Sequence, residues 1–194
     1  MRSEIAKRLE ESAQVKLAMA ETLTGQIENM VHLIVAAYRA GGKVVVFGNG
    51  GSAADAQHLA GELVGRFKLE RPALPAIALS TNTSILTAIA NDYGYDVVFS
   101  RQIEALVTEK DVVIGISTSG RSPNVIGAIK AAKKKGARTI VLTGGKGGPS
   151  RGRMAEVADL VLAVPSDSTP RIQESHITIG HIVCELVEKE LFGR

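Results

Sequence analysis

Hydrophobic residues recur at helical spacing through the first forty residues of the chain. One series runs over 5–17 and a second over 23–38. Residues three, four and seven positions apart share one face of a helix, so the pattern predicts two amphipathic helices. The second helix is expected to end at Gly41-Gly42, because glycine commonly terminates helices.

The pattern changes after residue 42. Short apolar runs then alternate with helical patterns, as is typical of buried parallel strands in an α/β protein. Strands are predicted at 44–47, 76–79, 112–116, 139–142 and 160–164. Helices are predicted at 53–67, 84–91, 98–109, 123–135 and 171–191. The sequence therefore predicts one α/β domain over 1–194, a three-layer sandwich whose core at 43–192 is a five-stranded parallel sheet flanked by helices.

The N-terminal helical pair, residues 1–40, has no predicted strand beside it in the sequence. It either packs on the sheet of its own chain or places its apolar stripe against another subunit. We expect the second arrangement, because the apolar positions are too many for helices that face solvent. The pair is thus predicted to form oligomerisation helices.

Composition narrows the class of protein. The 194 residues are 45% hydrophobic with a net charge of +3, the profile of a soluble globular domain. The longest basic run is Lys133–Lys135, too short to indicate a nucleic-acid partner. No segment reaches the roughly 18 apolar residues of a membrane span, and the first residues are charged where a signal peptide needs an apolar run. With one cysteine, Cys184, no internal disulfide is possible, and we expect a cytoplasmic protein.

A glycine-rich loop lies between the first predicted strand and the next predicted helix. Its sequence is Gly48-Asn49-Gly50-Gly51-Ser52. Glycines let the backbone approach a ligand, and the following helix N-terminus offers free N–H groups to an anion. Ligands of open parallel sheets bind beyond the carboxyl ends of strands, so we expect this loop to hold phosphate. The loop also fits a dinucleotide pattern, but the next strand does not end in an acidic residue, so we reject NAD.

A second loop, Ser117-Thr118-Ser119-Gly120-Arg121-Ser122, follows the third predicted strand. Its hydroxyl and N–H groups precede a helix and would cradle one phosphate. The lysine of a nucleotide-binding P-loop is lacking, which argues against nucleoside triphosphate hydrolysis. A third glycine-rich stretch, 142–148, is either a further site element or only a flexible turn.

His58 and Glu62 are the first candidates for acid/base chemistry. They are four residues apart on a predicted helix and so share one face. An imidazole and a carboxylate so placed can bind a divalent metal or act as an acid/base pair. The helix starts at the first predicted phosphate loop, which puts Glu62 a few turns from a bound anion.

Gln173 and His181 lie on the last predicted helix, eight residues apart. On a straight helix that separation is about 12 Å. They would meet at one metal ion only through long side chains, an irregular helix start or contributions from two subunits. The alternatives are a polar helix-start residue for Gln173 and a core histidine for His181.

Taken together, these motifs resemble the phosphoheptose isomerase family. The resemblance rests on the glycine loop, Asp55-Ala56-Gln57-His58 with Glu62-Leu63, Asn91-Asp92, the loop over 117–122, and Arg171-Ile172-Gln173-Glu174 with His181. Five separated motifs occur in the order of the family and span nearly the whole chain. One departure is Pro170, which stands where some members have an acidic residue.

The resemblance implies a fold, an assembly and a reaction. The fold would be the SIS fold, and the assembly a homotetramer with active sites between subunits. The reaction would be isomerisation of the sugar phosphate sedoheptulose 7-phosphate to D-glycero-D-manno-heptose 7-phosphate, the first step of ADP-heptose synthesis for bacterial lipopolysaccharide.

The resemblance also assigns roles to residues. Glu62 and His181 would be the catalytic acid/base pair. One Zn²⁺ per subunit would be held by His58, Glu62, Gln173 and His181. Substrate would be bound by Asn49, Gly50, Gly51, Ser52, Glu62, Asn91, Asp92, Ser117, Thr118, Ser119, Ser122 and Gln173.

A non-catalytic protein of the same superfamily, which binds the replication initiator, is the second interpretation. That relative shares a glycine loop, an Asn-Asp pair and the Arg-Ile-Gln-Glu run, and it resembles this chain over Thr87–Asp92. Its pattern lacks the glutamate and final histidine of the catalytic pair, whereas this chain has Glu62 and His181. A scaffold has no chemical need for both, so we expect an enzyme.

Overall fold

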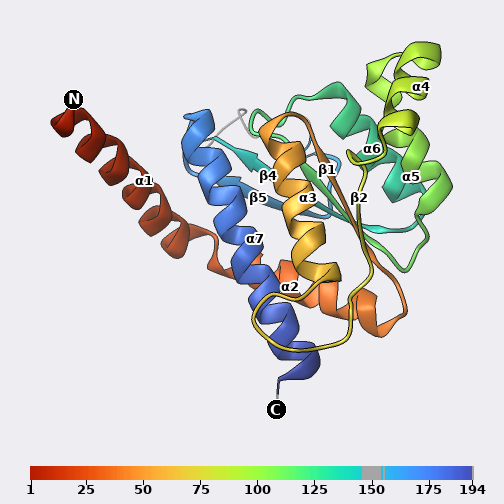
Figure 1. The fold of residues 1–194 in the computed structure, drawn as a ribbon, viewed down its shortest axis with the longest axis horizontal. Coiled ribbons are helices and arrows are strands. Elements are labelled where there is room, and N and C mark those ends of the chain that lie inside the picture. The colour runs from red at the N-terminus through yellow and green to blue at the C-terminus, as the bar shows by residue number, and fades with distance from the viewer. Residues whose placement is uncertain (146–153, 155, 194) are drawn as a thin grey trace.

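The computed structural model describes residues 1–145, 154 and 156–193, and its centre is one parallel sheet (Figure 1). The strand order is β2-β1-β3-β4-β5. The strands are β1 (Val44–Gly48), β2 (Ala76–Ala78), β3 (Val112–Ile116), β4 (Arg138–Gly144) and β5 (Leu160–Val164). Every residue of β1 and β3 is buried, as expected for central strands that are covered on both faces. The five predicted strands are thus confirmed.

Helices cover both faces of the sheet. They are α1 (Arg2–Thr22), α2 (Thr24–Arg39), α3 (Gly51–Val64), α4 (Thr83–Tyr93), the 3₁₀ turn η1 (Tyr95–Val97), α5 (Ser100–Leu106), α6 (Pro123–Lys134) and α7 (Thr169–Phe192). Alternate residues of β1 face opposite layers: Val44 and Val46 pack with α2, α3 and α7, whereas Val45 and Phe47 pack with α5 and α6. The three-layer sandwich is therefore confirmed.

Two predicted helices end three residues earlier than expected, and the first is α3, which was predicted to reach residue 67 but ends at Val64. The pattern over 98–109 predicted a helix, but α5 ends at Leu106. The carboxylate of Asp111 accepts hydrogen bonds from the backbone N–H groups of Thr108 and Lys43, at 2.8 and 2.9 Å. These bonds turn the chain into β3, which apolar spacing alone does not reveal.

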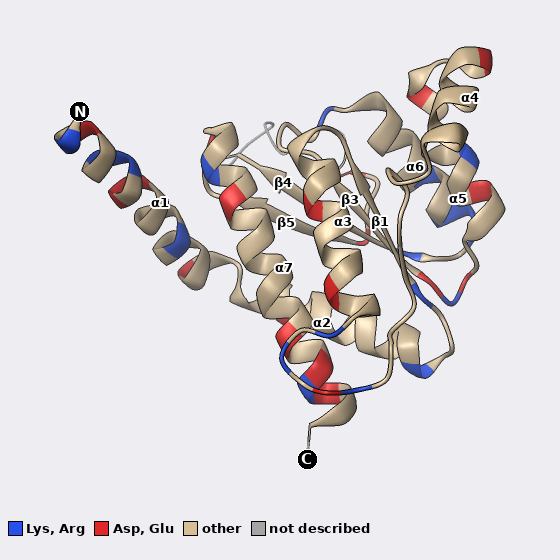
Figure 2. Cartoon of the chain, viewed as in Figure 1, with Lys and Arg blue, Asp and Glu red and all other residues tan. Residues whose placement is uncertain are grey.

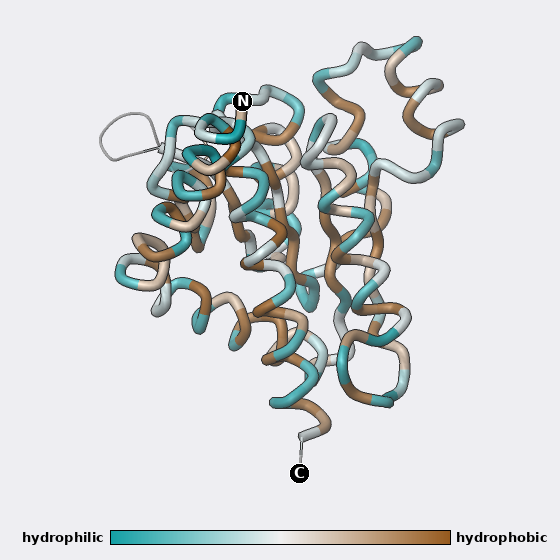
Figure 3. The backbone as a smooth tube through the Cα atoms, turned by 60° about the vertical axis from the view of Figure 1, so that its left-hand side comes forward, coloured by the Kyte–Doolittle hydropathy of each residue, from teal (hydrophilic) through white to brown (hydrophobic). Residues whose placement is uncertain are grey.

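Helix α2 packs inside its own chain, which corrects one expectation. Met30 is fully buried and Ile27 is 9% exposed, and both belong to the core cluster that α2 shares with α7 and the sheet. The prediction that both N-terminal helices lack an intramolecular partner is therefore wrong for α2. Hydrophobic and hydrophilic residues alternate along the helices, as Figure 3 shows, and the apolar face of α2 is turned inward.

Helix α1 extends away from the body of the domain (Figure 1). Charged residues are distributed along it (Figure 2), and polar bonds tie it to the start of α7. Ser12 Oγ donates to Glu174 Oε2 at 2.7 Å, and the Arg171 guanidinium donates to the carbonyl of Arg8 at 2.5 Å. The Arg171–Glu174 part of the predicted motif thus anchors α1. Among the described residues, no helix is long and apolar enough to cross a lipid bilayer.

His176, on α7, is fully buried in the core. Its Nε2 donates to the carbonyl of Thr143 at 3.1 Å, and its Nδ1 has no hydrogen-bond partner within the described part of the chain. Burial lowers the pKa of His176 from 6.5 to about 4. The imidazole is therefore neutral in the folded protein at neutral pH.

This buried histidine predicts a loss of stability in mild acid. Below pH 6.5 the unfolded chain protonates His176 while the folded chain does not, so the free energy of unfolding falls until the pH reaches about 4. Between pH 7 and pH 5 the loss should be about 2 kcal/mol. Urea unfolding at both pH values should show it in the wild type and in His32→Gln, where an exposed histidine is replaced. It should be largely missing in His176→Gln; equal losses in all three proteins would contradict the assignment.

Candidate active site

Helices α3 and α7 lie side by side and run in the same direction. Gly180 on α7 has no Cβ, and a Cβ there would lie 2.8 Å from the Leu59 side chain on α3. At the N-terminal ends, the Gln173 amide lies against Gly51. This close packing brings polar side chains of the two helices together, and those side chains build the site.

His58, Glu62 and His181 form one cluster on these helices, which we call the His/Glu triad. The Nε2 atoms of His58 and His181 are 3.0 Å apart, and His58 Nε2 is 3.1 Å from Glu62 Oε1. One ligand atom from each residue lies within 4.8 Å of the others. The structure thus brings together the predicted acid/base pair, Glu62 and His181, with His58 beside it.

The triad fits a divalent metal. Two imidazole nitrogens this close must either share one proton or turn both lone pairs toward a cation. Two histidines and one glutamate are a ligand set that zinc uses in proteins when a fourth position is left for water or substrate. The triad is partly open to solvent: the side chains of His58 and Glu62 are 47% and 23% exposed, which leaves access for a ligand.

Gln173 lies away from the triad in the same chain. Helix α7 is continuous from Thr169 to Phe192, so the eight residues between Gln173 and His181 span about 12 Å. The Gln173 amide instead contacts the glycine loop at Gly51. The structure therefore gathers three of the four expected metal ligands and places the fourth at the predicted phosphate site.

The glycine loop has the predicted position, between β1 and α3. Gly50 adopts a φ of 57°, a conformation that favours glycine. The Asn49 side chain forms a reciprocal amide pair with Asn124, with both N···O distances 3.0 Å. Asn124 is 2% exposed and lies at the start of α6. Asn49 therefore ties the glycine loop to the helix that follows the second loop.

The serine-rich loop lies at the carboxyl end of β3, which neighbours β1 in the sheet. Ser117 Oγ and Ser122 Oγ are 2.9 Å apart, and Ser119 Oγ accepts a bond from the N–H of Arg121. The two loops thus face the same edge of the sheet, as the sequence predicted. Residues 146–148 of the third glycine-rich stretch lie outside the described residues.

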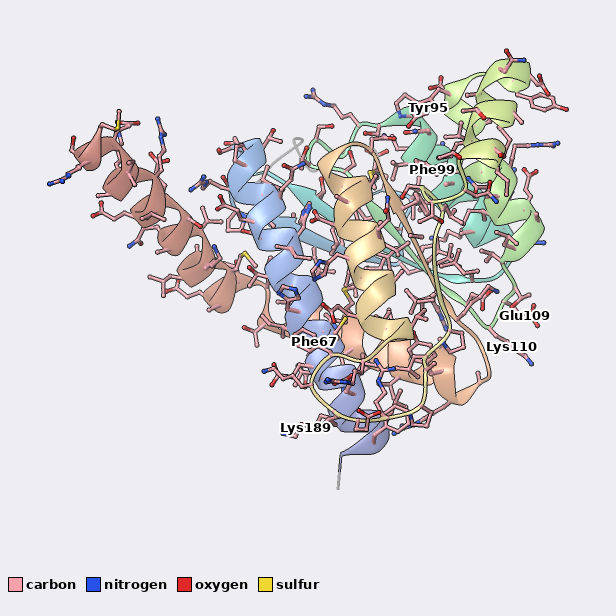
Figure 4. All side chains as sticks on the ribbon, in the orientation of Figure 1. Phe67, Tyr95, Phe99, Glu109, Lys110 and Lys189 are labelled. Atoms are coloured by element: carbon pink, nitrogen blue, oxygen red, sulfur yellow. The ribbon has the colours of Figure 1, made fainter. Side chains whose placement is uncertain are left out.

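Asn91 and Asp92 lie on α4, which stands at the top right of Figure 1. Both are exposed, and the Asn91 amide donates to Asp92 at 2.8 Å. Within the described part of the chain, neither side chain bonds to the loops or to the triad. The segment after α4 is instead linked to the glycine loop by Tyr95, which is labelled in Figure 4. Its hydroxyl lies 3.2 Å from Asn49 Oδ1.

Several residues around the site were given no role in the sequence analysis. Asp55 is one turn before His58 on α3, and its Oδ2 is buried without a hydrogen-bond partner among the described residues. Burial raises the pKa of this carboxyl, and the nearby His58 opposes the rise. Asn124, Tyr95, Phe67, Arg71 and Glu188 are further examples. For Glu188 the sequence did contain a signal, because an acidic residue stands in the apolar stripe of the last helix, seven residues after His181.

Comparisons with known proteins agree with this geometry. Residues 9–144 match the SIS domain family. A phosphoheptose isomerase from Geobacter sp. (strain M21) is 59% identical over 99% of this chain and 98% of its own length. One from Aquifex aeolicus is 55% identical over 100% of both chains.

Solved structures are similar in fold as well as in sequence. A phosphoheptose isomerase from Francisella tularensis has a TM-score of 0.91 and 37% identity, covering 96% of this chain and 97% of that one. One from Neisseria gonorrhoeae has a TM-score of 0.89 and 42% identity, covering 97% and 98%.

The triad predicts metal binding that depends on its own side chains. Purified, metal-stripped protein should bind Co²⁺, a spectroscopic substitute for zinc, with the visible absorption of a low-coordinate nitrogen and oxygen site. His58→Ala and His181→Ala should each weaken binding at least tenfold. His32→Ala, which removes an exposed histidine outside the triad, should leave it unchanged. Equal binding by all four proteins would show that the metal lies elsewhere.

Proposed function

Because this chain belongs to the SIS domain family, among the phosphoheptose isomerases, we propose that it converts sedoheptulose 7-phosphate to D-glycero-D-manno-heptose 7-phosphate. This is an aldose–ketose isomerisation, the first step toward ADP-heptose for lipopolysaccharide. The observation that carries the proposal is the His/Glu triad, which puts Glu62 and His181 together on helices that begin beside the glycine loop. The non-catalytic interpretation is not favoured, because the similar proteins are named as isomerases over full length.

The chemistry requires one proton to leave C1 of the ketose and one to arrive at C2. In the proposed mechanism, Glu62 removes the C1 proton while His181 protonates the oxygen on C2, which gives an enediol. The enediol then loses the proton on its C1 oxygen and gains one at C2, so the aldose forms with no net change in atoms. Glu62 and His181 suit these roles because both carry groups that exchange protons and both reach the same small region.

A zinc ion also belongs to this proposal. His58, Glu62 and His181 would hold it, and Gln173 would complete the ligand set from another subunit, since its own chain places it at the glycine loop. Bound there, the metal would supply Lewis-acid polarisation of the substrate oxygens.

Phosphate binding is assigned to the two loops at the neighbouring ends of β1 and β3. Asn49, Gly50, Gly51 and Ser52 would surround the sugar phosphate from one side, and Ser117, Thr118, Ser119 and Ser122 from the other. The helix N-termini that follow these loops, in α3 and α6, offer N–H groups to an anion. We propose that Asn91, Asp92 and Gln173 complete the substrate site.

We further propose a cytoplasmic homotetramer. Helix α1 exposes apolar side chains that its own chain does not cover: Leu9 is 67% and Leu17 is 59% exposed. Beside them, an apolar groove between α1, α2 and α7 is lined by Ile27, Val31 and Ile182, among others. Burying such surface between subunits contributes about 25 cal/mol per Å². Assembly would also bring the distant Gln173, Asn91 and Asp92 to sites shared between chains.

The acid/base role of Glu62 predicts a loss of turnover without a loss of folding. Glu62→Gln keeps the size of the side chain but removes the base, so kcat for sedoheptulose 7-phosphate should fall by about 10²–10⁴-fold. Glu70→Gln is the matched control, because that side chain is 92% exposed and outside the site. Aldose formation should be followed by NMR on protein of confirmed fold. A folded Glu62→Gln enzyme with near-normal turnover would exclude this residue as the base.

Assembly through α1 predicts that oligomer and activity are lost together. Leu9→Asp combined with Leu17→Asp places charge on the exposed apolar face and should yield a smaller species by light scattering, with at least tenfold lower turnover. Ile27 and Met30 would not serve here, because their replacement would disrupt the monomer core. Lys7→Asp, on the far side of α1 from Leu9, is the control and should change neither property. A dissociated double mutant with full activity would show that each chain holds a self-contained site.

A further inference from the structure

Glu188 on α7 is a buried carboxylate that takes no part in the proposed proton transfers. Its side chain is 1% exposed. Oε1 accepts from the N–H of Phe67 at 2.7 Å and from Arg71 Nε at 3.0 Å, and Oε2 accepts from the N–H groups of Lys68 and Leu69 at 2.8 and 3.0 Å. Burial by itself would raise the pKa of Glu188, but these four donors lower it. The group is therefore a carboxylate that holds one segment of backbone, residues 67–69.

Arg71, the ion-pair partner of Glu188, is hydrogen-bonded to the C-terminal turn of α3. Its side chain is also 1% exposed. It donates to the carbonyls of Glu62, at 2.8 Å, and Leu63, at 2.7 Å. Carbonyl groups in the last turn of a helix have no partner within the helix, so Arg71 fixes the turn that carries Glu62.

The segment held by Glu188 carries Phe67 onto the ring of His181. The two rings are stacked, with centroids 5.5 Å apart and an angle of 15° between their planes. The ring of His58 also lies against His181, at a centroid distance of 5.1 Å and an angle of 59°. Figure 4 labels Phe67 beside α7, where the loop that leaves the lower end of α3 crosses that helix in this view. The imidazole of His181 therefore contacts two rings, and one of them is set by the Glu188 loop.

We propose that Arg71, Glu188 and Phe67 are positioning residues for the isomerisation, with the ion pair as a clamp that orients both members of the acid/base pair. At one end the clamp is hydrogen-bonded to the backbone carbonyl of Glu62, and at the other it holds the loop in which Phe67 stacks on His181. Glu188 lies seven residues after His181, on the same face of α7. The inference rests on the proposed function, because it assigns to the clamp the orientation of groups that move protons.

A surface loop can form without a buried ion pair such as Arg71–Glu188. Burying two charges has a large desolvation cost, which only good geometry and further hydrogen bonds offset. The same loop has a surface ion pair, Lys68 with Glu185, whose side chains are 58% and 47% exposed. Such exposed pairs contribute little, so the buried pair is the one that fixes the loop. Glu185 therefore provides a matched control on the same helix.

The test compares Phe67→Leu and Glu188→Gln with two controls, Phe192→Leu and Glu185→Gln. Phe192 is a partly buried phenylalanine that packs against the same core cluster, at the C-terminal end of α7. For sedoheptulose 7-phosphate, the first two variants should lower kcat by about 10- to 100-fold, since misplacement of a catalytic group has effects of that size. KM should stay within about twofold, because none of these residues touches the loops that bind phosphate. Phe67→Tyr keeps the aromatic ring and should retain turnover.

A second readout does not depend on turnover. In metal-free protein with labelled histidine rings, the ring protons of His181, assigned with His181→Gln, should carry the upfield ring-current shift of Phe67. That shift should disappear in Phe67→Leu, shrink in Glu188→Gln and persist in both controls. Should Glu188→Gln fail to fold, Phe67→Leu alone carries both readouts.

Two results would overturn the proposal. The first is a folded Phe67→Leu enzyme with the kcat of the wild type, and the second is a His181 shift that does not respond to Phe67→Leu or Glu188→Gln. A wild-type protein that does not turn over the sugar phosphate would instead overturn the proposed function and with it the catalytic role of the clamp. The NMR comparison would then still decide whether Glu188 and Phe67 orient the ring.

Discussion

The close contact between α3 and α7 is the constraint on which the rest of the site depends. Gly180 lets Leu59 pack against the backbone of α7, and with a larger residue there the Leu59 side chain or the helix would have to shift. Because both helices run in the same direction, His58 and His181, which are the sequence neighbours of Leu59 and Gly180, meet beside this contact, and Glu62 lies about one turn beyond it. The distance between the two helices, which allows their polar side chains to form a metal site or an acid/base pair, is therefore set by an apolar contact.

The parallel sheet supplies the second half of the site. Neighbouring strands β1 and β3 end at the same edge, and each is followed by a loop and a helix N-terminus. The Asn49–Asn124 pair links the two loops, so they are held as one unit. The proposed anion-binding edge and the triad then lie at two levels of the same helix pair, with Gln173 at the upper level and His181 below. A sugar phosphate likewise has its phosphate at one end and its reacting carbons at the other.

Much of this organisation could be predicted from local patterns. The strands were found because buried parallel strands are continuous apolar runs, and the His58–Glu62 pair because helical spacing puts both on one face. The roughly 12 Å between Gln173 and His181 was also predicted, and the structure shows an uninterrupted helix there. Long-range contacts could not be predicted in this way. The apolar stripe of α2 has the same appearance whether it meets its own sheet or another chain, and the bonds of Glu188 join residues more than 110 positions apart.

The central claim is that the α3–α7 pair and the two loops form a sugar-phosphate isomerase site. Incubation of the purified wild-type protein with sedoheptulose 7-phosphate, with and without a metal chelator, tests it most directly. NMR should show an aldose 7-phosphate appearing at the expense of the ketose until an equilibrium is reached. Folded, zinc-supplemented protein that leaves the ketose unchanged would contradict the account.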